Sequence, residues 1–247
     1  MNRGLVNADR FNFSNDAAKL TGRFLARFDA IFTLNQDVLL EEHYMMPANN
    51  VTLLSERHPR WQGCHLPGMG RVRPADPTIQ ESWSKSIWQP ENQANFAVEA
   101  QSQPLFKLHG SSNWRYPDGR SMLIMGGAKV REINMTPILN WYATKFDEHL
   151  LAPGAKLMAI GYGFRDDHIN DALKRAVERG LKLFIIAPEG AELAQRLNPT
   201  TAPGHIRVKT ALEDMLEQSL IGASRRPLSS TFSNDAAEFE KITRFFS

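Results

Sequence analysis

The sequence predicts an α/β fold in which helices flank a parallel sheet. The clearest pattern is an apolar strand at Lys156–Ile160, a helix at Asp166–Arg179 and a second strand at Leu181–Ala187. Strand, helix and strand at this spacing form a βαβ unit, whose strands are parallel and whose crossover is right-handed. Two earlier apolar runs, Ala30–Leu34 and Leu105–Leu108, have the length and flanking residues of buried strands. We therefore expect the chain to be organised around parallel strands.

Hydrophobic spacing and helix-start signals predict the other elements. In chain order they are a helix at Phe13–Arg27, a helix at Val38–Tyr44, a helix at Ile138–Leu151, a strand at Ile206–Lys209 and a helix at Ala211–Leu220. The sequence FSNDAA occurs at 13–18 and again at 232–237, and we interpret it as a reused helix-start signal.

Residues 45–103 differ in character from the rest of the chain. They are rich in Pro, Gly, Asn, Gln and Trp and lack a long periodicity. A structureless loop of that length is uncommon in a compact domain, so we predict an irregular insert or small lobe. The predicted organisation is an N-terminal helical segment at 1–29, an α/β domain at 30–222 and a C-terminal tail with a short helix at 223–247.

Composition limits the classes of function. The 247 residues are 42% hydrophobic and 23% charged, with a formal net charge of +2. This near-neutral balance argues against a nucleic-acid partner or a membrane surface. The N-terminus lacks an apolar core of signal-peptide length, so we expect a cytoplasmic protein. Cys64 is the single cysteine, which excludes an internal disulfide and a four-thiolate zinc site within one chain.

Polar residues follow three of the predicted strands. The segments are TLNQD at 33–37, KLHGS at 107–111 and GYGFRDD at 161–167. Ligands of open parallel sheets bind at the carboxyl ends of the strands, so these segments are candidates for one site. Each also has a purely structural interpretation: Asn35 can cap a helix, His109 can be a hydrogen-bonded structural residue, and the Gly161 turn can be a tight connection. Asp166 and Asp167 are predicted to cap the following helix rather than to bind a metal.

Taken in order, TLNQD, KLHGS and GYGFRDDHIN (161–170) resemble the motifs of the SIR2-like family. The resemblance extends over roughly Ala30–Leu220. It implies a Rossmann-like domain that handles NAD, and an NAD hydrolase that cleaves the nicotinamide–ribose bond. It also implies a setting in bacterial anti-phage defence.

The same resemblance implies roles for individual residues. Asn35 holds the nicotinamide ribose or the attacking water, and His109 acts as general base. Asp37 lies near the nicotinamide carboxamide, while Gly161 and Tyr162 line the ribose and pyrophosphate. The remaining NAD-binding candidates are Thr33, Gly110, Ser111 and Gly163. Histidine suits a general base because its ordinary pKa is close to neutral.

Two departures from the family pattern shape the expected function. Cys64 alone cannot form the four-cysteine zinc module of protein-deacylating sirtuins, which indicates the zinc-free branch. No segment like Gly-Ala-Gly-x-Ser precedes Thr33, so we expect this chain to cleave NAD poorly unless an upstream segment supplies that loop. The alternatives are a sensor that binds NAD or a related nucleotide without turnover, and a scaffold that contacts a partner protein or a second copy.

Overall fold

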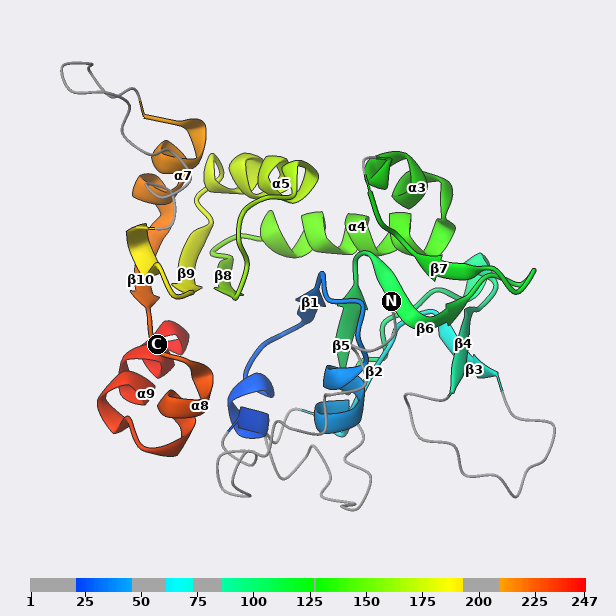
Figure 1. Ribbon diagram of the computed structural model, residues 1–247, viewed down its shortest axis with the longest axis horizontal. Helices are drawn as coiled ribbons and strands as arrows, with labels where there is room; N and C mark the ends of the chain where they lie inside the picture. Colours follow the sequence, from blue (N-terminus) through cyan, green and yellow to red (C-terminus); the bar gives the residue numbers. More distant parts are fainter. Residues whose placement is uncertain (1–20, 46–60, 73–85, 127, 193–208) are drawn as a thin grey trace. The chain divides into compact units, whose positions relative to one another are not determined.

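The computed structural model of the chain describes residues 21–45, 61–72, 86–126, 128–192 and 209–247 (Figure 1). The chain forms two compact units, Met1–Thr144 and Lys145–Ser247. Each unit contains parallel strands and helices, which confirms the predicted α/β class.

A three-stranded parallel sheet organises the first unit. Its order is β1 (Ile31–Thr33), β5 (Ser102–Lys107) and β2 (Gly63–His65). The predicted strands at 30–34 and 105–108 are confirmed by β1 and β5. In their register Thr33 lies opposite Lys107, so both strands end at the same edge of the sheet.

A second sheet of the first unit has the order β3-β4-β6-β7. Its strands are β3 (Met69–Val72), β4 (Ile87–Pro90), β6 (Gly110–Arg115) and β7 (Ser121–Leu123). The β3–β4 and β6–β7 pairs are antiparallel, and β4 pairs with β6 in parallel.

Residues 45–103 were predicted to form an irregular insert or small lobe, and where the structure describes them they contain short regular elements. These residues supply β2 to one sheet and β3 and β4 to the other, together with a short 3-10 helix, η3 (Gln93–Asn95). The strands are three or four residues long, which is too short for a periodic pattern to stand out. They are stabilised by neighbours distant in sequence, such as Trp114 opposite Trp88.

Helices complete the first unit. Residues 21–25 and 39–45 are helical, and the second stretch ends in a π-helical turn, η2 (Glu41–Met45). The earlier part of the helix predicted at 13–27 lies outside the described residues. Two helices follow the second sheet, α3 (Lys129–Met135) and α4 (Pro137–Leu150), and α4 continues past Thr144 into the second unit. The prediction of a helix at 138–151 is confirmed by α4, whereas α3 was not predicted.

Aromatic side chains form the centre of the first unit's core. The Tyr142 ring packs edge-on against Phe106 at 4.9 Å and against Trp114 at 6.1 Å between centroids. All three side chains are fully buried. The Tyr142 hydroxyl donates a hydrogen bond of 2.6 Å to the carbonyl oxygen of Pro67, so its polar atom is satisfied within the core.

The second unit contains the predicted βαβ unit. Strands β8 (Lys156–Ile160) and β9 (Lys182–Ile186) are parallel and are connected by α5 (Asp167–Val177). The third strand, β10 (Leu220–Ser224), pairs in parallel with β9 on its other side. This strand was missed, because its first residue was assigned to the preceding helix and its last two to the tail. The strand predicted at 206–209 lies outside the described residues except for Lys209, which is not in a strand.

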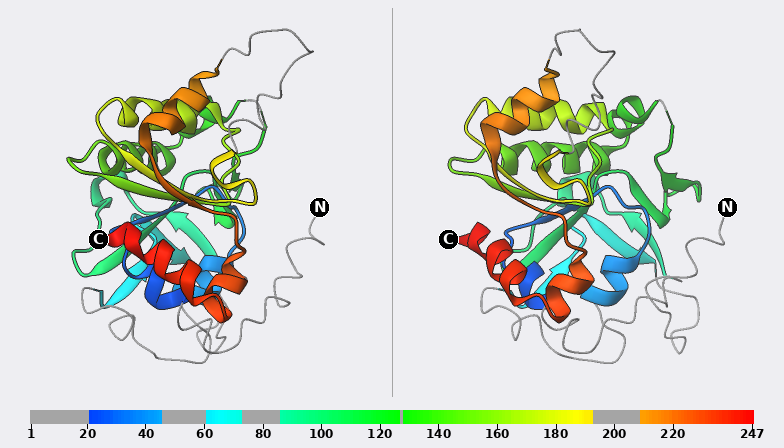
Figure 2. Two further views of the ribbon diagram at one scale, coloured as in Figure 1. Left: turned by 90° about the vertical axis from the view of Figure 1, so that its left-hand side faces the viewer. Right: turned by 60° about the vertical axis from the view of Figure 1, so that its left-hand side comes forward.

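The remaining helices of the second unit are α7 (Ala211–Ser219), α8 (Leu228–Ser233), α9 (Ala236–Thr243) and the 3-10 helices η4 (Gly190–Glu192) and η5 (Arg244–Phe246). Figures 1 and 2 show α5 and α7 side by side, with α8 and α9 beyond the carboxyl end of β10. The later FSNDAA copy does start a helix, because Asp235 accepts a hydrogen bond from the Glu238 N–H at 3.0 Å. The earlier copy lies outside the described residues.

None of the helices in the described part of the chain is long and apolar enough to cross a membrane.

Strand β10 can be tested through Gly222. A Cβ at this position would come within 2.5 Å of one Phe184 ring atom and 2.8 Å of another. We expect Gly222→Ala to lower the free energy of unfolding by about 1–3 kcal/mol, because the buried ring must move. Urea denaturation measures the loss. Gly163→Ala is the control, since its Cβ meets only Arg165 Cγ at 4.0 Å. Equal effects of the two substitutions would contradict the position of β10.

Candidate functional site

The carboxyl ends of β1 and β5 bring two of the sequence motifs together. Beyond the pairing of Thr33 with Lys107, the Leu108 N–H donates to the Thr33 carbonyl oxygen at 3.0 Å. Asn35 and His109 each lie two residues past this paired position. The first unit thus places the TLNQD and KLHGS segments on adjacent strand ends, as expected for a ligand site of a parallel sheet.

Local hydrogen bonds shape the segment that carries Asn35. The Asn35 N–H donates to the Thr33 hydroxyl at 3.0 Å, which turns the chain at the end of the strand. Asp37 Oδ1 accepts from the Leu39 N–H at 3.1 Å and so begins the next helix. The observed capping side chain is therefore Asp37, while Asn35 is an exposed residue of the turn.

The His109 turn is built differently. His109 is 4% exposed, and its carbonyl oxygen accepts from the Ile124 N–H at 3.0 Å. Gly110 follows at φ +76°, and a Cβ there would overlap the carbonyl oxygen of Met122. Only glycine meets both conditions. Ser111 is fully buried, and its hydroxyl lies 3.4 Å from the carbonyl oxygen of Gln36.

Gln36 joins the two segments, and the sequence prediction missed it. Its Nε2 donates to the carbonyl oxygen of His109 at 3.0 Å and to that of Ile124 at 2.5 Å. Its own carbonyl oxygen accepts from the Ser112 N–H at 2.8 Å. The residue between Asn35 and Asp37 thus fixes the backbone of His109. Its only signal in the sequence was its position inside a motif.

A buried ion pair also contacts the segment that follows β1. Lys107 Nζ lies 2.7 Å from Glu41 Oε1, and both side chains are 1% exposed. Lys107 also donates to the carbonyl oxygen of Asp37. Burial lowers the pKa of Lys107 and raises the pKa of Glu41, and each partner opposes the other's shift. The sequence could not reveal this pair, because a charged residue on a helix is ordinarily exposed.

The GYGF segment follows β8 in the second unit. Gly161 has φ +65°, and its N–H donates to the Ile186 carbonyl oxygen at 2.8 Å. Among the described residues other than its chain neighbours, no atom lies within 4 Å of the position of a Cβ. Phe164 adopts φ 52° although it is not glycine, and its side chain is buried. A left-handed conformation at an aromatic residue is strained and needs support from its surroundings.

Asn170 supplies part of that support. Its Nδ2 donates to the Phe164 carbonyl oxygen at 2.9 Å, while its Oδ1 accepts from the Tyr162 hydroxyl at 2.9 Å. Burial raises the pKa of Tyr162, so the hydroxyl remains a donor. As predicted, Asp166 occupies the N-cap position of α5 and Asp167 lies in its first turn, although the Asp166 side chain makes no capping hydrogen bond.

The hydrogen bonds of Gln36 predict that its substitution lowers the stability of the fold. We expect Gln36→Leu to lower the free energy of unfolding by about 1–3 kcal/mol, because two carbonyl oxygens lose a donor. Gln89→Leu is the matched control, since Gln89 donates to one carbonyl oxygen, that of Tyr116, at 3.3 Å. Denaturant titration compares the two variants. A Gln36→Leu variant no less stable than Gln89→Leu would contradict the joining role.

The ion pair predicts strong coupling between two substitutions. Lys107→Met is expected to cost about 3–5 kcal/mol, because it leaves the Glu41 carboxylate buried without a cation. Adding Glu41→Gln removes that charge, so the double variant should be more stable than Lys107→Met alone. A double-mutant cycle from urea denaturation checks this. If the losses of unfolding free energy in the two single variants add up to the loss in the double variant, the two charges do not interact.

Comparison with known proteins places these motifs in a family. No curated protein matches the chain. The model of one protein family, described as the SIR2-like domain, matches residues 29–202. This range contains all three motif segments, and the parallel sheets flanked by helices agree with the predicted Rossmann-like architecture. Because the match covers well over half of the 247 residues, the chain belongs to the SIR2-like domain family.

Proposed function

We propose that the chain binds NAD and cleaves its nicotinamide–ribose bond with water as acceptor. The observation that carries the proposal is the pair Asn35 and His109, which lies at the carboxyl ends of two paired parallel strands and is joined through Gln36. Membership of the SIR2-like family supports NAD as the ligand. Consumption of NAD would also suit the bacterial defence setting that the resemblance implies.

The chemistry requires positioning more than a strong acid. When the bond between ribose C1′ and the pyridinium nitrogen breaks, its electron pair returns to the nitrogen and nicotinamide leaves as a neutral molecule. The ribose passes through an oxocarbenium-like state, as in glycoside cleavage. The Asn35 amide offers both a donor and an acceptor to a ribose hydroxyl or to the water. His109 takes a proton from that water as its oxygen bonds to C1′.

Other residues are proposed to hold the NAD molecule. Thr33, Asp37, Gly110 and Ser111 flank the pair on the first unit. For Gly161, Tyr162 and Gly163 of the second unit, the family resemblance implies contact with the ribose and the pyrophosphate. Within the part of the chain that the structure describes, the position of a Gly161 Cβ is open, which favours close approach of a ligand to the backbone there.

A second candidate function is nucleotide binding without turnover. The observation that favours it is the burial of His109, which is 4% exposed, because a general base must come within hydrogen-bond distance of the proton that it takes.

Substitution of the pair tests the proposal. We expect His109→Ala and Asn35→Ala to lower nicotinamide release from NAD by about 100-fold or more, because a general base contributes at least that factor. Affinity for ADP-ribose should change little. His149→Ala is the control, since His149 Nδ1 bonds to the Lys145 carbonyl oxygen within α4.

Chromatography of the released nicotinamide, beside calorimetry with ADP-ribose, separates the candidate functions. Cleavage that survives His109→Ala would end the catalytic assignment. Binding of ADP-ribose without any cleavage by the unchanged chain would favour the binding module.

A further inference from the structure

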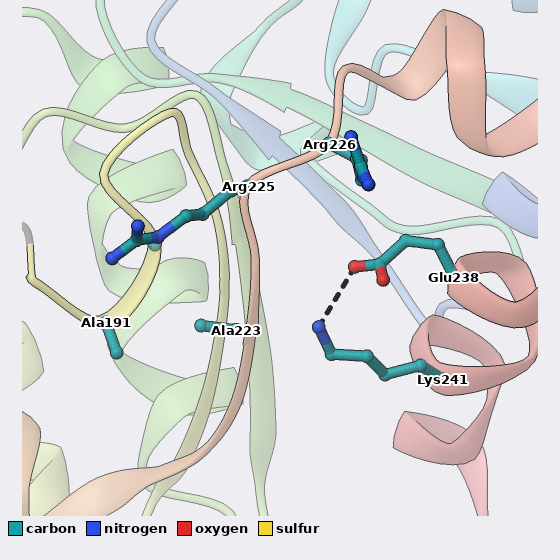
Figure 3. Close-up of a pocket in the computed structure, with 7 residues that line it drawn as sticks. Ala191, Ala223, Arg225, Arg226, Glu238 and Lys241 are labelled. Atoms are coloured by element: carbon teal, nitrogen blue, oxygen red, sulfur yellow. Dashed lines mark hydrogen bonds and ion pairs between the residues drawn. The ribbon is translucent and has the colours of Figure 1, made fainter. Parts of the chain in front are cut away.

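A second charged site lies at the carboxyl ends of β9 and β10. A pocket of about 290 Å³ opens there between the Gly190 turn, the residues that follow β10, and α9. Figure 3 shows Arg225 reaching over the loop of Ala191 on one side, and Arg226, Glu238 and Lys241 on the other. No role was assigned to this pocket from the sequence.

Positive charge dominates the lining of the pocket. Among the described residues that line it are three cations, Arg225, Arg226 and Lys241, and one carboxylate, Glu238. A hydrogen bond from Ser224, followed by the one from Lys241, lowers the pKa of Glu238, so this carboxylate stays ionised at neutral pH. Its charge is matched by Lys241 at 3.0 Å. Because Lys241 balances the charge of Glu238, the net positive charge of the lining comes from Arg225 and Arg226.

Both arginines have carboxylate partners outside the lining. Arg225 pairs with Glu192 at 2.5 Å, and Arg226 lies 3.6 Å from Asp235. These side chains are largely exposed, apart from the partly buried Asp235, and exposed ion pairs contribute little to stability. A phosphate can replace such a partner, because charge-assisted bonds from a guanidinium to phosphate are strong and often bidentate.

Gly190 determines where Arg225 lies. A Cβ on Gly190 would come within 2.9 Å of Arg225 Cγ and 3.3 Å of its Nε, so the arginine side chain occupies the space that a larger residue would fill. Gly190 also has φ +57°, which glycine adopts without strain. The glycine in the turn after β9 thus leaves room for the Arg225 side chain.

The sheet order relates this pocket to the GYGF segment. The strands run β10-β9-β8, and Gly161 follows β8. Adjacent strands lie about 4.8 Å apart, so the pocket is on the order of 10 Å from the end of β8. A dinucleotide laid along the carboxyl edge of such a sheet can span both positions.

We propose that this pocket binds a phosphate monoester on the adenosine ribose of a nucleotide, with Arg225 as the residue that selects for it. The ligand class rests on the proposed NAD function, and the selectivity goes beyond it. NAD carries its negative charges in the central pyrophosphate, whereas a 2′-phosphate adds a dianion at the adenosine end. Arginine is the residue that accommodates this group in dinucleotide-binding sheets.

Calorimetry with two ligands tests the proposal. ADP-ribose and its 2′-phosphorylated form are titrated into the full chain, its Arg225→Gln variant and its Arg175→Gln variant. Arg175 is the matched control, because it is similarly exposed and pairs with Asp147 on another part of the unit. We expect the 2′-phosphate to improve affinity about tenfold in the unchanged chain and in Arg175→Gln, and the gain to disappear in Arg225→Gln.

The outcomes separate this inference from the proposed function. Equal affinity for the two ligands, or a preference that survives Arg225→Gln, overturns the inference and leaves nucleotide binding intact. If inorganic phosphate abolishes the preference at the concentration at which the 2′-phosphorylated ligand saturates, the site is one for free phosphate and the inference also fails. Binding of neither nucleotide overturns both proposals.

Discussion

The parallel pairing of β1 with β5 is the constraint on which the candidate site depends. Thr33 lies opposite Lys107, so the two segments that follow leave the same edge of the sheet on adjacent strands. A shift of the register by one residue would turn Lys107 to the other face and break its contact with Glu41. The backbone pairing thus determines both which residues reach the edge and which charge is buried beneath it.

Hydrogen bonds and an ion pair then fix the segment after β1 relative to the His109 turn. Gln36 bonds to the His109 backbone, and Lys107 bonds to the carbonyl oxygen of Asp37 and to Glu41. Burial of two charges is costly, and a well-packed apolar pair is often as stable or more so. The contribution of the ion pair is positional, because Lys107 connects the Asp37 backbone to the strand that precedes His109. Preorganised groups of this kind are what a reaction limited by positioning requires.

Regular patterns made part of the fold predictable. The βαβ unit of β8, α5 and β9 combines apolar strands with a helix of clear amphipathic spacing, so its boundaries came within a few residues. Strand β10 was missed because Leu220 continues the apolar pattern of α7, and the close packing of Gly222 against Phe184 depends on a residue distant in sequence. The short strands between residues 63 and 90 depend on partners distant in sequence and have no local signature.

The candidate site was predictable to a similar degree. Asn35, His109 and Gly161 stand out because polar residues and glycine follow apolar runs. Gln36 and Glu41 do not, since their roles come from hydrogen-bond partners more than sixty residues away. The basic pocket beside β10 was also out of reach, because it joins the Gly190 turn to α9 through a strand that the sequence did not indicate.

The central claim is that Asn35 and His109 face the nicotinamide ribose of bound NAD. A crystal structure of the His109→Ala variant with NAD tests it most directly, because the intact dinucleotide should remain bound. We expect the nicotinamide ribose to lie within hydrogen-bond distance of the Asn35 side chain, beside the space left by the imidazole. NAD bound with that ribose away from the ends of β1 and β5 would contradict it.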